Sequence, residues 1–184
     1  MARADQDTAP WRPNLSWITD HLAVGGRFPV ERAEALAQEL AIRAVVDLRS
    51  EACDDAFVLK RHGITLLHLP TDDHQAVAQP MLEDGVAFVR PHLDRGERVL
   101  IHCEHGIGRS ATLALCVLVE RGYEPLEALE LSKTKRALIS PSPAQYNAWT
   151  EWLARFAREQ RASWEIPSFD AFKAIAYRHL QPVT

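Results

Sequence analysis

The chain has 184 residues, of which 47% are hydrophobic, and its 21 basic and 25 acidic side chains give a formal net charge of −4. This length and balance predict one globular domain with a sizeable core and exclude wholesale disorder. Without a basic excess, general nucleic-acid binding is not expected. The charge is uneven, because residues 1–132 are acidic overall and residues 133–184 are basic.

Cysteine usage and the first residues bear on the compartment. Three cysteines are too few, and odd in number, for a disulfide framework, which suits a reducing environment. The opening MARADQDTAPWRP holds acids and prolines where a secretion signal needs an apolar stretch. The longest apolar run, residues 111–119, is far shorter than the roughly 20 residues that cross a membrane. We therefore expect a cytoplasmic monomer without a membrane span.

In chain order, β-favouring runs alternate with amphipathic ones after an N-terminal arm at residues 1–14. Strands are predicted at residues 15–26, 44–48, 64–69 and 99–102. Helices are predicted at residues 30–40, 54–62, 81–93, 110–121, 125–136, 142–158 and 168–179, and Pro91 is expected to kink or shorten the third of them. This alternation predicts an α/β fold with a central, mostly parallel sheet flanked by helices and a helical C-terminal part.

Residues 100–110, LIHCEHGIGRS, join a strand to a glycine-containing loop and then to an apolar helix. Such a loop aims successive backbone N–H groups, and the positive end of the helix dipole, at one point. Glycine allows the sharp turn and the close approach of a ligand. The loop is therefore predicted to bind a phosphate or another oxyanion through Glu104, His105, Gly106, Ile107, Gly108 and Arg109.

Cys103 begins this loop and is the candidate nucleophile. Amides, a helix N-terminus and a nearby cation lower a thiol pKa from about 8.5, so Cys103 would be a thiolate at neutral pH. The planar fork of Arg109 can hold two phosphate oxygens. We expect Ser110 to donate a hydrogen bond to the thiolate. We expect His102 to fix the loop by hydrogen bonds and not to transfer protons.

Plainer interpretations of these residues exist. A lone cysteine at a strand end is usually a small buried hydrophobe. His102, Cys103 and His105 could be a fragment of a metal site, but no C-x-x-C or H-x-x-x-H pair elsewhere completes one. We therefore expect no metal and no cofactor. The succession of strand, His-Cys, five residues with two glycines, Arg-Ser and buried helix favours catalysis.

HCEHGIGRS resembles the signature of the cysteine-dependent protein tyrosine phosphatases, and the following Ser-Ala makes it more similar to the dual-specificity branch. The resemblance extends over residues 15–157 and includes SWITDHLAVGG, VVDLRSE, HLPTDDH and SPSPAQYNAW. It implies a phosphatase-like single domain at residues 15–160, followed by a C-terminal helical extension at 161–184. It also implies a two-step reaction through a phosphocysteine intermediate.

That reaction needs a proton donor for the leaving oxygen, a role that an aspartic acid can fill. In the resembled family the acid lies about thirty residues before the cysteine, which fits Asp73 best and leaves Asp72 as the alternative. Repulsion between two adjacent carboxylates helps one of them keep a proton. The plain alternative is a solvated loop, in which Asp is common.

Several further residues have two interpretations. Gln145 matches a water-orienting glutamine of the family, or is an exposed residue of a first helical turn. A basic cluster either steers an anionic substrate or forms a solvated helix face, which we favour; it consists of Lys133, Lys135 and Arg136. Three residues after the strand at 44–48, or at its end, are expected to orient neighbouring loops: Asp47, Arg49 and Glu51.

The remaining cysteines and the tryptophans are expected to be structural. Cys116 is expected in the core. Cys53 could form a reversible disulfide with an oxidised Cys103, but its position does not match that of the family's second cysteine. Core or surface packing is expected for Trp149, Trp152 and Trp164.

The resemblance implies hydrolysis of phosphate monoesters, most of all phosphotyrosine and phosphoserine or phosphothreonine in proteins. No match to a pocket-deepening loop with a tyrosine is present, which predicts a shallow pocket. A phosphoinositide or other small phosphate monoester is the alternative, although Glu104 and His105 stand where lipid-directed relatives carry lysines. A binding-only pseudophosphatase and a sulfurtransferase are less favoured.

Overall fold

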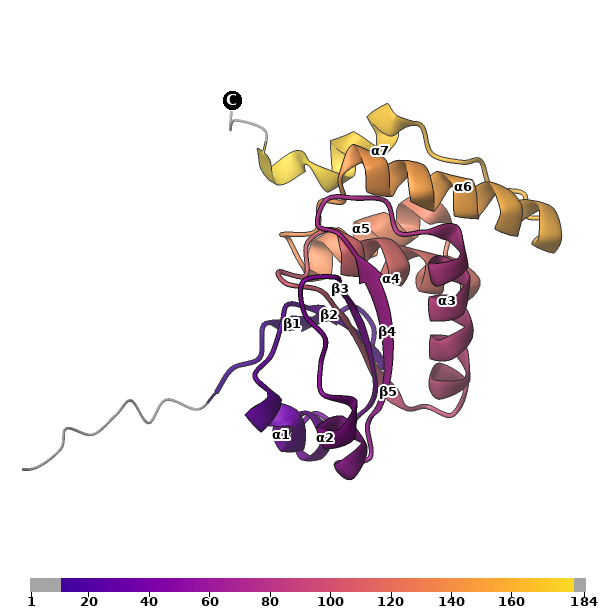
Figure 1. Ribbon diagram of the computed structural model, residues 1–184. Coiled ribbons are helices and arrows are strands. Elements are labelled where there is room, and N and C mark those ends of the chain that lie inside the picture. Colours follow the sequence, from indigo (N-terminus) through magenta and orange to yellow (C-terminus); the bar gives the residue numbers. More distant parts are fainter. Residues whose placement is uncertain (1–10, 181–184) are drawn as a thin grey trace, which may run out of the picture.

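The computed structural model describes residues 11–180 and shows one sheet with helices on both faces (Figure 1). The sheet has the order β1-β2-β5-β3-β4, in which β1 is antiparallel to β2 and the other neighbours are parallel. Its strands are β1 (Leu15–Trp17), β2 (Leu22–Gly25), β3 (Ile42–Arg49), β4 (Thr65–Thr71) and β5 (Arg98–His102). The predicted α/β class with a mostly parallel sheet is confirmed.

Seven α-helices and two 3₁₀ turns lie within residues 11–180. The helices are α1 (Ala33–Gln38), α2 (Ala56–Arg61), α3 (Gln79–Asp94), α4 (Arg109–Glu120), α5 (Pro125–Lys135), α6 (Pro143–Gln160) and α7 (Phe169–Ala176). The 3₁₀ turns are η1 (Val30–Arg32) and η2 (Arg178–Leu180). The α3 helix continues through Pro91 to its end, because a proline in the last turn removes only one backbone hydrogen bond. No helix among these residues is both long and apolar enough to cross a bilayer.

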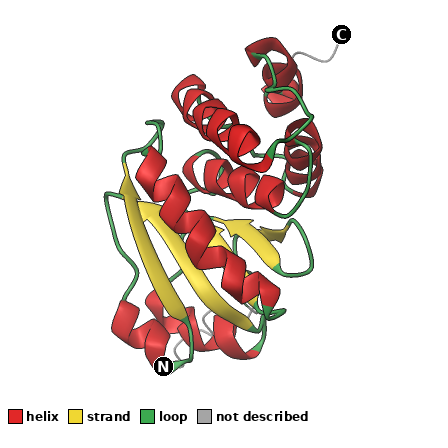
Figure 2. Ribbon diagram, turned by 90° about the vertical axis from the view of Figure 1, so that its right-hand side faces the viewer, coloured by secondary structure: helices red, strands yellow, loops and turns green. Residues whose placement is uncertain are grey.

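Two hydrophobic clusters pack against the two faces of the sheet. The larger contains α4, which is buried from Arg109 to Val119 because it lies between the sheet and other helices. Figure 2 shows α3 lying across this face. The smaller cluster holds α1 and α2 against the opposite face through Leu36 and Leu59. The helix that was predicted to be apolar nearly all round is thus buried all round, and Cys116 on it is a core residue, as expected.

The C-terminal helices belong to the larger cluster. Phe172 of α7 is fully buried, and its ring centroid lies 4.9 Å from that of Tyr146 and 6.1 Å from that of Trp149. Trp149 and Trp152 are buried, and Trp164 is partly buried against the cluster, so all three tryptophans pack as expected. Burial of one such ring contributes about 2–3 kcal/mol to stability.

The structure describes only the last four residues of the predicted N-terminal arm, residues 11–14. Residues 1–10, like residues 181–184, lie outside the described part of the chain. Trp11 packs against the smaller cluster, and Asn14 Oδ1 accepts a hydrogen bond from Arg136 at 2.8 Å. Residues 11–14 of the predicted arm therefore contact the domain through Trp11 and Asn14.

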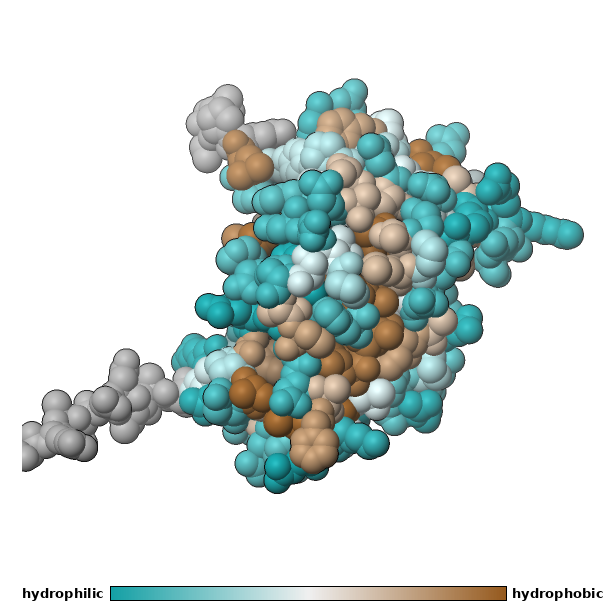
Figure 3. Space-filling model, viewed as in Figure 1, coloured by the Kyte–Doolittle hydropathy of each residue, from teal (hydrophilic) through white to brown (hydrophobic). Residues whose placement is uncertain are grey.

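The face seen in Figure 3 is mostly hydrophilic, with apolar residues gathered over β4 and α2. Strand β4 lies at the edge of the sheet, and Phe57 of α2 is 72% exposed.

Candidate active site

The loop between β5 and α4, residues 103–108, is shaped by two glycines. Gly106 has φ of +69°, and a Cβ there would lie only 2.5 Å from the Gly25 carbonyl oxygen at the end of β2. A Cβ on Gly108 would overlap Gln145 Oε1. Gly106 therefore lets the loop fold back against β2, and Gly108 lets it approach Gln145 of α6 closely.

Cys103 lies at the base of this loop and is 3% exposed. Its Sγ lies 3.3 Å from Ser110 Oγ and accepts a hydrogen bond from the Gly106 amide at 3.3 Å. Burial opposes ionisation, but hydrogen bonds from the Ser110 hydroxyl and from the amides of Ser110, Gly106 and Ile107 outweigh it. The pKa of the Cys103 thiol is therefore lower than its ordinary value, which favours the nucleophilic thiolate.

Arg109 begins α4 and is 1% exposed. It donates two hydrogen bonds of 2.8 Å to the Glu51 carboxylate and a third of 2.8 Å to the Thr71 carbonyl. Its Nε is buried without a hydrogen-bond acceptor among the described residues and lies 3.5 Å from Asp73 Oδ1. The guanidinium is thus held in place by its two terminal nitrogens, while the N–H of Nε is available to an oxyanion.

Glu51 was expected to orient a neighbouring loop, and in the structure its carboxylate orients the Arg109 side chain. The hydrogen bonds from Arg109 lower the pKa of Glu51 to about 2, so the carboxylate stays ionised at neutral pH. Sequence reasoning did not pair these two residues, because 58 positions separate them and no local pattern links them.

His102 points to the opposite side of the strand end, into a buried polar network. Its Nε2 hydrogen-bonds to Asp54 Oδ2, and its Nδ1 lies 3.2 Å from the Cys103 carbonyl oxygen. Arg49 links Asp54 to Asp47 by ion pairs of 2.8 and 2.9 Å. This network supports the backbone at Cys103, and none of its members lines the cavity that Cys103 lines.

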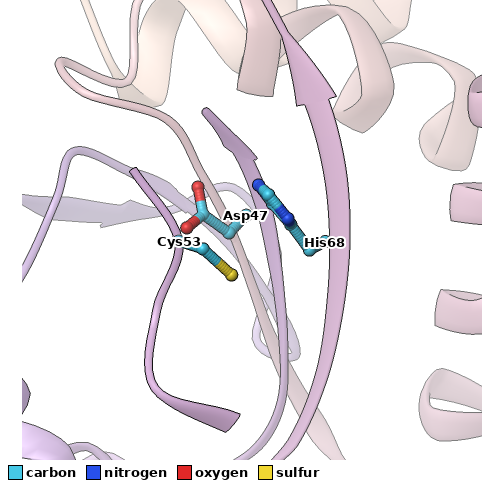
Figure 4. Close-up of side chains that lie close together, drawn as sticks. All are labelled: Asp47, Cys53 and His68. Carbon is cyan, nitrogen blue, oxygen red and sulfur yellow. The ribbon is translucent and has the colours of Figure 1, made fainter. Parts of the chain in front are cut away.

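Within the described residues, two groups of side chains have the spacing of metal ligands: Asp47 with Cys53 and His68, and Asp47 with Asp54 and His102. Figure 4 shows the first group, which converges from β3, the following loop and β4. Both oxygens of Asp47 already accept hydrogen bonds from Arg49, and one also accepts from the Asp54 amide. A cation here would have to displace the arginine, so the arrangement fits an ion-pair network better than a metal centre.

Cys53 is exposed and lines a different cavity from the one that Cys103 lines. Its Sγ donates to the Asp54 carbonyl at 3.3 Å. Burial and the nearby carboxylates of Asp47 and Asp54 raise the pKa of the Cys53 thiol, so it is a poor partner for disulfide exchange with Cys103.

A cleft of ≈ 250 Å³ opens in front of Cys103. Its lining comes from the loop after β4, the Cys103 loop and the segment that enters α6: Asp73, His74, Cys103, His105, Ile107, Gly108, Ser140 and Gln145. Asp73 Oδ1 accepts a hydrogen bond of 3.0 Å from the His74 amide. Asp72 does not line the cleft, and its Oδ1 accepts from Ser50 Oγ at 2.6 Å. The fold thus brings Asp73, and not its neighbour, toward Cys103.

Glu104 is part of the loop, but its side chain turns outward. It pairs with Arg27 at 3.0 Å and, more distantly, with Arg49 at 3.7 Å. Of the residues predicted to bind substrate, Glu104 can therefore contribute only its backbone.

Gln145 is 1% exposed, so its interpretation as an exposed first-turn residue was wrong. Its Oε1 accepts from the Ser142 amide at 2.9 Å, closing a capping box at the start of α6. Its Nε2 donates to the Gln75 carbonyl at 3.2 Å. Gln145 thus ties the loop after β4 to α6 and also lines the cleft.

The basic cluster at the end of α5 was predicted either to steer an anionic substrate or to form a solvated helix face. Both interpretations were wrong for Lys133 and Arg136, because their side chains are buried. Arg136 is 6% exposed and donates to the carbonyls of Gly106 at 2.7 Å and His105 at 2.9 Å. Lys133 is 1% exposed and donates to the carbonyls of Ile139 and Ala176, each at 2.7 Å. Only Lys135 is exposed. Amphipathic periodicity could not show that backbone carbonyls of distant segments accept from these cations.

The site and the fold together define a class of protein. The sequence model of the dual specificity phosphatase catalytic domain matches residues 28–155. The chain therefore belongs to the dual specificity phosphatase family, and the resemblance of its motifs is confirmed.

Two relatives show the extent of the similarity. Dual specificity protein phosphatase 1 of Homo sapiens is 36% identical over 127 residues, which are 68% of this chain and 33% of that protein. Phosphatidylglycerophosphatase and protein-tyrosine phosphatase 1 of Mus musculus is 28% identical over 141 residues, 72% of this chain and 73% of that protein. The chain thus spans about a third of the length of the first relative and about three quarters of the second.

Solved structures share the fold. The crystal structure of PTPMT1 in complex with PI(5)P has a TM-score of 0.75 and 23% identity, and the match covers 80% of this chain and 99% of that one. Tk-PTP in the active form has a TM-score of 0.70 and 26% identity over 78% of this chain and 98% of that one. The agreement covers nearly the whole of each solved chain.

Proposed function

We propose that the protein hydrolyses phosphate monoesters through a phosphocysteine intermediate, acting on phosphotyrosine and on phosphoserine or phosphothreonine in proteins. The observation that carries the proposal is the position of a buried thiol with a lowered pKa beside loop amides and the free Nε of Arg109. These groups match an attacking thiolate and a phosphoryl group whose three equatorial oxygens gain charge in the transition state.

In the first step, Cys103 Sγ attacks phosphorus and the bond to the leaving oxygen breaks. Asp73 is the proposed general acid and gives that oxygen a proton, because it lines the cleft with Cys103. In the second step, Asp73 takes a proton from a water molecule that attacks phosphorus, and the thiolate leaves. Gln145 is proposed to orient that water, and Ser110 to stabilise the departing thiolate by its contact of 3.3 Å.

The test combines three variants with aryl phosphates. Cys103→Ser should abolish turnover, whereas EDTA should not change it. Asp73→Asn should lower kcat about 10²- to 10⁴-fold and remove the alkaline limb of the pH–rate profile. Asp72→Asn is the matched control and should keep that limb. Turnover by Cys103→Ser, with full loss in EDTA, would refute this mechanism.

A second substrate class follows from the relatives. The mouse relative named as a phosphatidylglycerophosphatase and protein-tyrosine phosphatase aligns over most of both chains. Against a polyanionic lipid stands the cleft itself, whose lining residues include Asp73, His74 and His105 but no lysine. A panel of phosphotyrosine and phosphothreonine peptides, phosphoinositides and nucleotides at equal concentration decides between the classes. A kcat/KM for a phosphoinositide that exceeds those for the peptides would reassign the substrate.

We further propose that the protein is a cytoplasmic, metal-independent monomer. A nucleophilic thiolate works only while it is reduced, and the reducing cytoplasm keeps it so. Arg109 and the loop amides supply the positive potential that a metal ion would otherwise provide. Light scattering of the purified protein tests the monomer, and imaging of a tagged chain tests the compartment.

A further inference from the structure

The segment between α5 and α6, residues 136–142, which we call the α5–α6 loop, lies between the catalytic cleft and the C-terminal helix. Its cleft side contacts both the Cys103 loop and the loop after β4 that contains Asp73. The Ser140 amide donates to the Ile107 carbonyl at 3.0 Å, which joins it to the Cys103 loop. Ser142 Oγ donates to the His74 carbonyl at 2.7 Å, one residue after Asp73. The position of the proposed acid thus depends on this loop.

The opposite side of the α5–α6 loop is held by the C-terminal segment. Tyr177, directly after α7, donates its hydroxyl to the Pro141 carbonyl at 2.6 Å. Lys133 Nζ donates both to the Ile139 carbonyl and to the Ala176 carbonyl at 2.7 Å, which ties the loop to the end of α7. The α7 helix cannot shift easily, because Phe172 and Ala176 are fully buried.

These contacts form a continuous connection from α7 to the acid. It runs from Tyr177 to Pro141, then to the adjacent Ser142, and from Ser142 to His74 beside Asp73. Burial raises the pKa of the Tyr177 hydroxyl, so this group stays protonated and can donate over the whole working range.

We propose that Tyr177 is a positioning residue for the reaction: through Pro141 and Ser142 it fixes the loop that carries Asp73 over Cys103. The proposal rests on the proposed function and adds a role for the C-terminal helix. Tyr177 touches no reacting atom, and its effect is confined to the geometry of proton donation. Proton donation matters more for a poor leaving group than for a good one, which gives a specific measurement.

The experiment compares kcat/KM for phenyl phosphate, a poor leaving group, with that for p-nitrophenyl phosphate, a good one. Because one hydrogen bond is lost, Tyr177→Phe should lower kcat/KM for phenyl phosphate about fivefold. It should lower kcat/KM for p-nitrophenyl phosphate less than twofold. Inhibition by vanadate should stay unchanged, because the anion loop is intact. Ser142→Ala removes the last hydrogen bond of the connection and should change the ratio in the same direction.

Tyr146→Phe is the matched control. Tyr146 also donates its hydroxyl to a proline carbonyl, that of Pro167 at 2.8 Å, and so anchors the C-terminal segment. Tyr146 contacts the α5–α6 loop through its backbone amide, which donates to the Ser142 carbonyl and is retained in the phenylalanine variant. The melting temperature should fall by a similar amount in both tyrosine variants. Only Tyr177→Phe should change the ratio of kcat/KM for phenyl phosphate to kcat/KM for p-nitrophenyl phosphate. Equal ratios in wild type and in the Tyr177 and Ser142 variants overturn the proposal. A wild-type protein that hydrolyses neither substrate refutes the proposed function instead.

Discussion

Replacing Gly106 by alanine tests how tightly neighbouring segments fix the anion loop. Any L-residue at φ of +69° incurs a backbone cost of about 1–2 kcal/mol. At this position the new Cβ would also lie 2.5 Å from the Gly25 carbonyl oxygen. An ordinary contact needs about 3.5 Å, so the loop or the end of β2 must move by about 1 Å.

A displacement of that size matters more for catalysis than for folding. The amides of the loop must point at the phosphoryl oxygens, and a 1 Å error can reduce the rate about 10²-fold. We therefore expect Gly106→Ala to lower kcat/KM by about 10²-fold or more and to weaken vanadate binding, while the domain stays folded.

Gly96→Ala separates the backbone cost from the steric one. Gly96 has a similar φ of +70°, but a Cβ there meets nothing within 4 Å. Urea denaturation should show a loss of about 1–2 kcal/mol for Gly96→Ala and a greater loss for Gly106→Ala. Steady-state kinetics should show wild-type kcat/KM for the Gly96 variant. The reasoning is refuted if both variants lose the same stability and both keep wild-type kcat/KM.

Three further predictions address the surroundings of the loop. Ser110→Ala should raise the pKa of Cys103 toward its ordinary value, because the hydrogen bond from the Ser110 hydroxyl that favours the thiolate is lost. The pH dependence of alkylation by iodoacetate measures this pKa, and an unchanged profile would contradict the prediction. Arg136→Met should lower the free energy of unfolding by about 2–4 kcal/mol, measured by urea denaturation, because the carbonyls of Gly106 and His105 lose their donor. The same variant should weaken vanadate binding. Arg136→Lys should not restore both contacts, and full rescue by lysine would argue against this role. Burial lowers the pKa of Lys133 to about 8, so the unfolded chain binds more protons than the folded one between pH 8 and about 10.5. The free energy of unfolding of the wild-type protein should therefore rise with pH across this window, relative to that of Lys133→Met. A fall instead would show that the folded state favours the charged lysine.

The loop chemistry was predictable because its determinants are adjacent in sequence. Within residues 102–110, the strand end, the glycines and the helix start follow one another, and local backbone geometry alone directs their amides to one point. The same holds for α4, whose continuous apolar composition predicts burial on all sides. Long-range partners left no such pattern, as the pairing of Arg109 with Glu51 and the burial of Gln145 show.

Periodicity and motif spacing are local properties, so the sequence alone predicted the α/β class and singled out Cys103 as the candidate nucleophile and Arg109 as the candidate phosphate-binding residue. For the general acid, the resemblance favoured Asp73 and kept Asp72 as the alternative; the folded chain adds that Asp73 lines the cleft whereas Asp72 accepts a hydrogen bond from Ser50. Only the tertiary structure decided that Lys133 and Arg136, which read as a solvated basic face, are buried donors to carbonyls of distant segments. A buried cation is stable only where such acceptors converge, and their convergence is a property of the folded chain.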